Sequence, residues 1–169
     1  MDEHTLAKFL VEDTFTKPFL NKRLRLLREF AELASYTKPG SSWPEYLSLA
    51  NIGDEEALIL TKWHDEAVRV AGHKPLVFAM KQFEGVCETI PTITVFLPTQ
   101  PDNETLKAIA GWFRENLDPT VLLEIIVKPE LVTGCAFVHK GTYHDFSLHY
   151  FFTKHREDIK GVIDEYTRA

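Results

Sequence analysis

The chain has few of the residues that build disulfides, membrane spans or export signals. Cys87 and Cys135 are its two cysteines in 169 residues, too few for a disulfide framework. We therefore expect two reduced thiols that pack as small apolar side chains. No apolar run approaches the ~20 residues that a membrane-spanning helix needs, and Met1 to His4 lack the basic start of a signal peptide. These absences predict a cytoplasmic protein without direct membrane insertion.

Positive charge is also scarce. Nineteen Lys and Arg residues stand against 25 Asp and Glu residues, which gives a formal net charge of −6. Such a field disfavours binding to nucleic acid or to anionic lipid. A chain with this charge that visits a membrane is expected to do so by holding another protein. The composition, 44% hydrophobic and 26% charged, is typical of a globular protein with one large or two small domains.

Motifs for metal and phosphate chemistry are missing. The sequence has no Gly-rich phosphate loop, no His-Glu-x-x-His run and no Cys-x-x-Cys pair. His139, His144, His149 and His155 lie close together in sequence, and His139 and His144 flank an expected hairpin turn. On a helix, however, His149 and His155 would lie on different faces, and a zinc site needs three or four ligands in fixed geometry. Exposed or half-buried histidines are therefore the favoured interpretation over a small metalloenzyme.

Candidate nucleophiles have no activating partners. Ser147 follows an expected strand and opens an expected helix, as the serine of a nucleophile elbow does. Its neighbours Phe146 and Leu148 are not the glycines that such a turn needs, so helix capping is favoured. Cys87 has no adjacent basic residue to lower its pKa. We expect no catalytic residue, no cofactor and no metal, and hence a protein that is not an enzyme.

Apolar residues at helical spacing predict a small helical bundle over residues 1–84. Leu6, Phe9 and Leu10 form the stripe of a first helix over residues 5–13. The stripe of the second helix consists of Leu20, Leu24, Leu27, Ala31 and Ala34. After an expected loop over residues 38–42, further helices are expected from Ser42 to about Ala50, from Asp54 to Gly72, and over residues 76–83.

A row of basic residues lies beside the second stripe. Lys22, Arg25 and Arg28 line the face next to it. They form either a binding strip for an acidic partner or an ordinary solvated face opposite the core, and the solvated face is the norm. Trp43 and Trp63 are expected to anchor the core of the bundle.

Residues 85–169 predict a second, α+β domain with the order β-α-β-β-β-α. Residues 85–97 are rich in β-formers, and Pro91 makes them either two short strands or one kinked edge strand. Thr99 is expected to cap the helix that follows. Three strands come next, over residues 122–127, 133–139 and 142–146. They predict a small mixed sheet with helices packed on one face.

The final residues predict one amphipathic helix that begins after Ser147. Its apolar face consists of Leu148, Phe151, Phe152, His155, Ile159, Val162, Ile163 and Tyr166. Tyr150 precedes two phenylalanines, so the three aromatic side chains surround more than one face. Exposed aromatics favour a protein interface, because rigid rings supply contact area at low entropic cost. The alternative is a fully enclosed helix.

The order of these features resembles the carboxy-terminal domain of the delta subunit of bacterial rotary ATP synthases, a relative of the mitochondrial oligomycin-sensitivity-conferring protein. That family has a valine-rich strand, a proline corner, a Gly-Gly step, a hairpin, an Asp-Gly-Ser step and a terminal helix. Here the corresponding positions are residues 127–131, Thr133 with Gly134, the turn at Lys140 and Gly141, and residues 145–147. Thr133 and Phe146 stand where the family has glycine.

The resemblance implies a non-catalytic subunit of the peripheral stalk, in a complex attached to the membrane. Its helical domain (residues 1–84, shorter than usual for the family) would hold amino-terminal segments of the alpha subunits. Its second domain (85–169) would hold the carboxy-terminal end of the b-type stalk subunits. Expected head contacts are Leu6, Phe9, Leu10, Lys22, Arg25 and Arg28. Expected stalk contacts are Tyr150, Phe151, Ile159 and Ile163. Gly134, Gly141, Asp145 and Ser147 would be structural. The alternative is a helical and α+β adaptor unrelated to the synthase.

Overall fold

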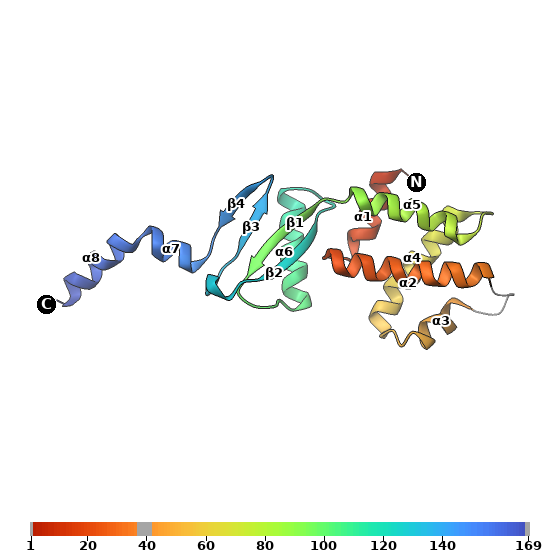
Figure 1. Cartoon of the computed structure of the whole chain (residues 1–169), viewed down its shortest axis with the longest axis horizontal. Helices are drawn as coiled ribbons and strands as arrows, with labels where there is room; N and C mark the ends of the chain where they lie inside the picture. The colour runs from red at the N-terminus through yellow and green to blue at the C-terminus, as the bar shows by residue number, and fades with distance from the viewer. Residues whose placement is uncertain (1, 37–41, 168–169) are drawn as a thin grey trace. The chain divides into compact units, whose positions relative to one another are not determined.

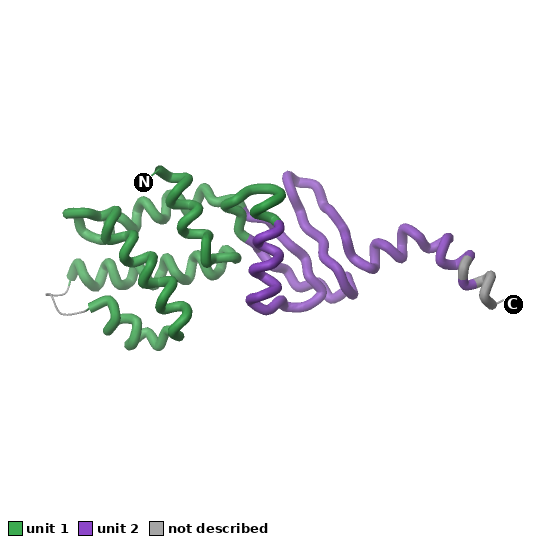
Figure 2. Tube along the Cα trace, turned by 180° about the vertical axis from the view of Figure 1, so that it is seen from behind, with its two compact units in different colours: residues 1–91, 113–122 green, residues 92–112, 123–169 purple. Residues whose placement is uncertain are grey.

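The computed structural model describes residues 2–36 and 42–167, with the side chains of residue 162 and residues 164–167 left out. The chain forms two compact units, drawn in different colours in Figure 2. Unit 1 comprises residues 1–91 and 113–122, and unit 2 comprises residues 92–112 and 123–169. We expected the boundary after Glu84. The chain instead leaves unit 1 after Pro91 and returns to it for ten residues. Together the units contain helices and one small sheet, which confirms the α+β class (Figure 1).

Unit 1 is the predicted helical bundle. Its helices are α1 (Glu3–Glu12), α2 (Lys17–Tyr36), α3 (Trp43–Leu49), α4 (Asp54–Ala71) and α5 (Leu76–Thr89). Helix α5 packs along both α2 and α4 (Figure 1). The expected loop over residues 38–42 lies outside the described residues except for Ser42.

The apolar stripes of these helices meet in one core. Leu27 of α2, Leu60 of α4 and Phe83 of α5 are fully buried. Trp43 and Trp63 are 6% and 2% exposed, so both tryptophans lie in the core as predicted. Burial of each such side chain stabilises the fold by roughly 1.5–3 kcal/mol. The amphipathic spacing in the sequence is thus sufficient to specify the bundle.

Helix α5 extends further than the sequence suggested. We expected a β-rich segment over residues 85–97, but α5 continues to Thr89 and the first strand begins at Thr92. The buried side chains Ala79, Met80, Phe83 and Val86 keep the helical spacing through this stretch. Ile90 has extended backbone angles because the following proline disfavours helical geometry. The prediction of strand from residue 85 was therefore wrong, and Pro91 marks the change.

Replacing Gly85 with alanine should raise the stability of unit 1. Gly85 is exposed within α5, and a Cβ added there meets nothing within 4 Å. Alanine is favoured over glycine inside a helix by about 0.5–1 kcal/mol, and urea denaturation would measure the gain. Gly72→Ala is the control, because its φ of +58° strains any residue with a Cβ and should lower stability. A loss of stability in Gly85→Ala would contradict the helical assignment.

The sheet of unit 2 has four strands in the order β2-β1-β3-β4. The strands are β1 (Thr92–Leu97), β2 (Leu122–Val127), β3 (Ala136–His139) and β4 (Thr142–Asp145). Strand β1 pairs antiparallel with β3, with Val95 opposite Phe137, and β3 pairs antiparallel with β4. The amides of Leu122 and Lys128 donate to the carbonyls of Pro91 (3.0 Å) and Leu97 (2.7 Å), so β2 runs parallel to β1. The predicted mixed sheet is confirmed.

Helix α6 (Asn103–Asn116) lies on the sheet face that carries Val95 and Phe137. The rings of Trp112 and Phe137 are 6.5 Å apart, and Leu106 and Ala110 are buried. The cap differs from the prediction: Oδ1 of Asp102, not Thr99, accepts a hydrogen bond of 2.8 Å from the amide of Thr105. A carboxylate at this position also complements the helix dipole.

The carboxy-terminal segment departs most from its prediction. A short 3₁₀ turn, η1 (Pro129–Leu131), forms the proline corner, and two helices, α7 (Leu148–Lys154) and α8 (Arg156–Thr167), replace the single helix. The break lies at His155, where φ is −104° and ψ is 20°. Two residues earlier, the hydroxyl of Thr153 donates to the carbonyl of His149 at 2.9 Å, a contact that bends helices. Val162 and Tyr166, which we expected on the apolar face, have side chains outside the described set. No helix of the described ranges has the length and apolar character to cross a bilayer.

Candidate interaction surfaces

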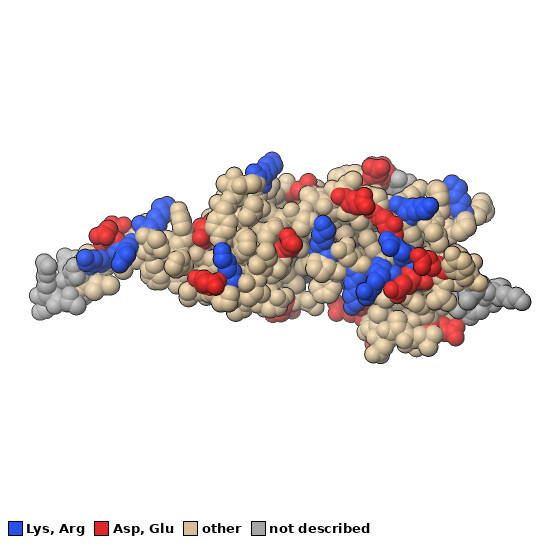
Figure 3. Space-filling view, in the orientation of Figure 1, with Lys and Arg blue, Asp and Glu red and all other residues tan. Residues whose placement is uncertain are grey.

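The basic row of α2 is exposed but largely neutralised. Lys22, Arg25 and Arg28 all lie on the surface, as expected. Nε of Arg25 lies 3.7 Å from Glu29, and Nη2 of Arg28 lies 2.5 Å from Glu84. Acidic and basic side chains lie intermingled over this part of the bundle in Figure 3. The row therefore provides local ion pairs rather than one positive strip, as a solvated helical face does.

The expected contacts on α1 divide between core and surface. Leu6 and Leu10 are 4% and 0% exposed, and both belong to the core of unit 1. Phe9 is half-buried and packs against that core. Leu6 and Leu10 therefore do not line the surface on which we expected a partner. A stripe at helical spacing is first of all a core signal.

The sequence analysis did not predict that an arginine beside the basic row is buried. Arg23 is 5% exposed, and its Nε and Nη2 donate to Glu56 Oε1 (3.0 Å) and Oε2 (2.6 Å). Its Nη1 donates to the carbonyl of Asp13 and to Oγ1 of Thr14, both at 2.6 Å. These hydrogen bonds from Arg23 lower the pKa of Glu56. The sequence signal was its position in the α2 stripe, three residues after Leu20. Arg23 joins α2, α4 and the turn after α1.

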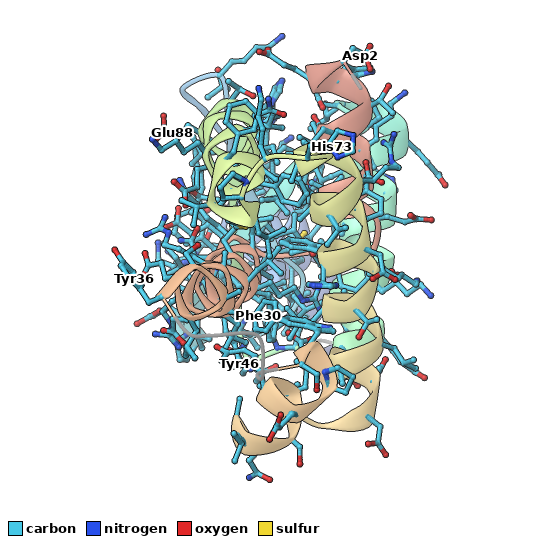
Figure 4. The ribbon with its side chains drawn as sticks, turned by 90° about the vertical axis from the view of Figure 1, so that its right-hand side faces the viewer. Asp2, Phe30, Tyr36, Tyr46, His73 and Glu88 are labelled. Atoms are coloured by element: carbon cyan, nitrogen blue, oxygen red, sulfur yellow. The ribbon has the colours of Figure 1, made fainter. Side chains whose placement is uncertain are left out.

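Four aromatic side chains of unit 1 form a closed cluster. The ring of Trp43 stacks on His64 at 4.7 Å, and Phe30 lies 4.9 Å from Trp43 and 5.5 Å from Tyr46. Figure 4 shows Phe30 and Tyr46 together between α2 and α3. Burial and the nearby Glu29 raise the pKa of Tyr46 to about 12. Because the rings are in mutual contact, the cluster attaches α3 to α2 and α4.

Exposed apolar side chains of unit 1 lie on several helices. Tyr36 on α2, Leu49 on α3 and Leu58 on α4 are 90%, 82% and 68% exposed. Phe19, near the start of α2, is 40% exposed. These residues are among the exposed apolar groups of unit 1, whereas Leu6 and Leu10 of the α1 stripe are buried.

In unit 2, the Asp-x-Ser step of residues 145–147 fixes the start of α7. Oδ1 of Asp145 accepts from the amide of Ser147 (2.9 Å), and Oγ of Ser147 accepts from the amide of Tyr150 (3.1 Å). Ser147 is 2% exposed, and its predicted role as a helix cap is confirmed. The amide of Leu148 donates to the carbonyl of Thr133 at 3.0 Å. The start of α7 is therefore fixed to the segment that follows η1.

Two glycines of unit 2 have backbone positions that a residue with a Cβ would not easily occupy. Gly134 has φ of +85°, and a Cβ there would overlap the carbonyl oxygen of Phe146 and lie 3.1 Å from Cα of Ser147. Gly141 has φ of +77° beside Lys140 with φ of +50°, which makes the hairpin turn between β3 and β4. Gly134 is needed for close approach and Gly141 for turn geometry.

Beyond this step, α7 and α8 expose most of their large side chains. Tyr150, Phe151, Phe152 and Ile163 are 45%, 52%, 50% and 56% exposed, and Ile159 is half-buried. No residue of α7 is buried. Of the two alternatives left open by the sequence, the enclosed helix is not observed. We call Tyr150, Phe151, Phe152, Ile159 and Ile163 the aromatic surface.

The histidines do not converge on a metal site in the part of the chain that is described. There, no group of three or more His, Cys, Asp or Glu side chains is placed to hold a metal ion. The ring of His144 stacks on Phe137 at 4.9 Å, and the ring of His155 lies 4.7 Å from Phe151. Burial raises the pKa of the Cys87 thiol to about 12, which opposes thiolate chemistry.

Comparison of the sequence with models of known protein families finds no match. No curated protein matches it either.

Proposed function

We propose that this chain is a non-catalytic stator subunit of a proton-translocating rotary ATP synthase, which links the catalytic head to the b-type stalk. The observation that carries the proposal is the aromatic surface on α7 and α8, held by the Asp-x-Ser step. The order of strand, proline corner, glycine step, hairpin and helix in unit 2 is the order of the family that the sequence resembles. A stator resists torque, and that task requires rigid contact surfaces rather than a reactive pocket.

The aromatic surface is suited to holding helices. Each half-exposed ring brings a large, rigid contact area, and such rings supply much of the energy of protein interfaces. Two consecutive short helices such as α7 and α8 can pack against the apolar face of a partner helix. We propose that unit 2 binds the carboxy-terminal end of the b-type stalk subunits there, which would place the chain at the membrane periphery.

Unit 1 would hold the amino-terminal segments of the alpha subunits. Its exposed apolar residues Phe19, Leu49 and Leu58 provide contacts for an amphipathic helix. Lys22, beside Phe19 on α2, is exposed and available to an acidic residue of that helix. An adaptor unrelated to the synthase would have no affinity for these segments, so head binding separates the two proposals.

The proposal is tested by calorimetry with the soluble carboxy-terminal segment of the stalk subunit from the same organism. The double variant Phe151→Ser, Phe152→Ser should bind at least tenfold more weakly, because truncation of central aromatic contacts costs about 1–2 kcal/mol or more. Phe19→Ser is the matched control: its ring is comparably exposed, at 40%, but lies in unit 1. The control should bind the stalk segment normally. Equal affinity of the double variant and the wild type would contradict the assignment of the aromatic surface.

A further inference from the structure

A hollow opens beside the aromatic surface in unit 2. It has a volume of about 380 Å³. Its lining consists of Val132, Leu148, His149, Phe152, Thr153 and Arg156. Helix α7 packs against η1 here, so the hollow lies between the proline corner and the break between α7 and α8. It is large enough for one apolar side chain and the end of a backbone.

The wall of the hollow contains a strained residue. Val132 has φ of +66° and ψ of −56°, and the amide of Thr133 donates to the carbonyl of Leu131 at 2.7 Å. This is a γ-turn of the rare, strained kind, and a β-branched residue is a genuine outlier in it. Val132 is nevertheless 66% exposed. A strained backbone that displays an apolar side chain to solvent is typical of a contact site.

The hollow has one charged group among its described lining residues. This group is the guanidinium of Arg156, and no described lining residue is acidic. The hydroxyl of Thr153 is engaged with the carbonyl of His149. Among the residues whose side chains the structure describes, Arg156 has no ion-pair or side-chain hydrogen-bond partner. An unpaired guanidinium beside apolar walls fits a carboxylate attached to an apolar group, because its planar fork matches a carboxylate.

We infer that the hollow receives the carboxy-terminal residue of a partner helix. The apolar side chain of that residue packs between Val132, Leu148 and Phe152, and its free α-carboxylate pairs with Arg156. A helix end suits this site better than a helix start, because its unpaired carbonyls and dipole are negative. The inference deepens the proposed function: it rests on the stalk being the partner, and it assigns recognition to the chain end itself.

The test compares two synthetic peptides of the last 20 or so residues of the stalk subunit, one with a free carboxylate and one amidated. Fluorescence anisotropy with the full chain should show the amide to bind at least tenfold more weakly. Arg156→Gln should weaken the free acid by a similar factor and remove the difference between the two peptides. Lys154→Gln is the control, because Lys154 lies over the ring of Tyr150, 5.7 Å from its centroid, and does not line the hollow.

The outcomes separate the inference from the proposed function. Equal binding of acid and amide would overturn the carboxylate inference while leaving the stalk as partner. An equal loss in Arg156→Gln and Lys154→Gln would also overturn it, because general charge attraction would then suffice. Binding of neither peptide, together with no binding of the whole soluble stalk segment, would reject the proposed function.

Discussion

Replacing Gly134 with alanine should destabilise unit 2 by about 3–5 kcal/mol. The positive φ alone costs a residue with a Cβ about 1–2 kcal/mol. The larger loss comes from the overlap of that Cβ with the carbonyl oxygen of Phe146. This oxygen belongs to the backbone and can move only if the segment between β4 and α7 moves. Movement there disturbs the hydrogen bond from the Phe146 amide to the Cys135 carbonyl (2.9 Å) and the Ser147 cap. Amide hydrogen exchange in β3 and α7 measures the loss.

Gly141→Ala is the matched control for this prediction. Gly141 also has a positive φ, +77°, but a Cβ added there meets nothing within 4 Å. Gly141→Ala should lower the free energy of unfolding by only about 1 kcal/mol. If both variants lost the same stability, close approach at Gly134 would not be what fixes α7.

Removing the guanidinium of Arg23 should strongly lower the stability of unit 1. Arg23→Ala leaves the Glu56 carboxylate, the Asp13 carbonyl and the Thr14 hydroxyl without their donor. Loss of one partner of a buried ion pair costs about 3–5 kcal/mol, because the remaining charge is uncompensated. Glu56 retains 21% exposure, which places the expected value at the lower end of that range. Urea denaturation of unit 1 measures it.

Arg25→Ala serves as the control on the same helix. Its side chain is 68% exposed and its ion pair with Glu29 is surface-screened. The stability change should stay within about 0.5 kcal/mol. If Arg23→Ala and Arg25→Ala lowered stability by the same amount, the buried ion pair of Arg23 would add no more stability than an exposed one.

The same pair makes unit 1 sensitive to acid. The pKa of Glu56 is lowered from its ordinary 4.5 by the hydrogen bonds from Arg23. A depressed carboxyl pKa contributes stability that is present above pH 4.5 and is lost as the pH falls through the folded-state value. The wild type should therefore lose stability below pH 4.5 more steeply than Glu56→Gln. Parallel pH profiles for the two proteins would contradict this assignment.

Elements with a clear hydrophobic period could be predicted from the sequence. The bundle follows from apolar residues at helical spacing in α1, α2 and α4, and the hairpin from the turn at Lys140 and Gly141. Ser147 was recognisable as a cap because it precedes an apolar helical period. In each case a local pattern and its tertiary environment agree, which is the condition for reading structure from sequence.

The features that could not be predicted depend on distant partners. The β-formers in residues 85–97 suggested a strand from residue 85, but packing of Val86 in the core keeps α5 helical to Thr89. The position of Arg23 in the α2 stripe indicates burial, but its partner Glu56 lies 33 positions later in the sequence, and no local pattern predicts that pair. The exposure of Phe151 and Phe152 depends on what covers α7, and an amphipathic pattern does not specify the covering group.

The central proposal is that this chain binds two partner proteins and catalyses no reaction. Sedimentation velocity of the purified chain with the catalytic head and the soluble stalk segment of the same organism tests it most directly. We predict one complex that contains all three components at micromolar concentration, and its loss in the Phe151→Ser, Phe152→Ser variant while head binding persists. A wild-type chain that sediments alone in the presence of both partners would contradict the account.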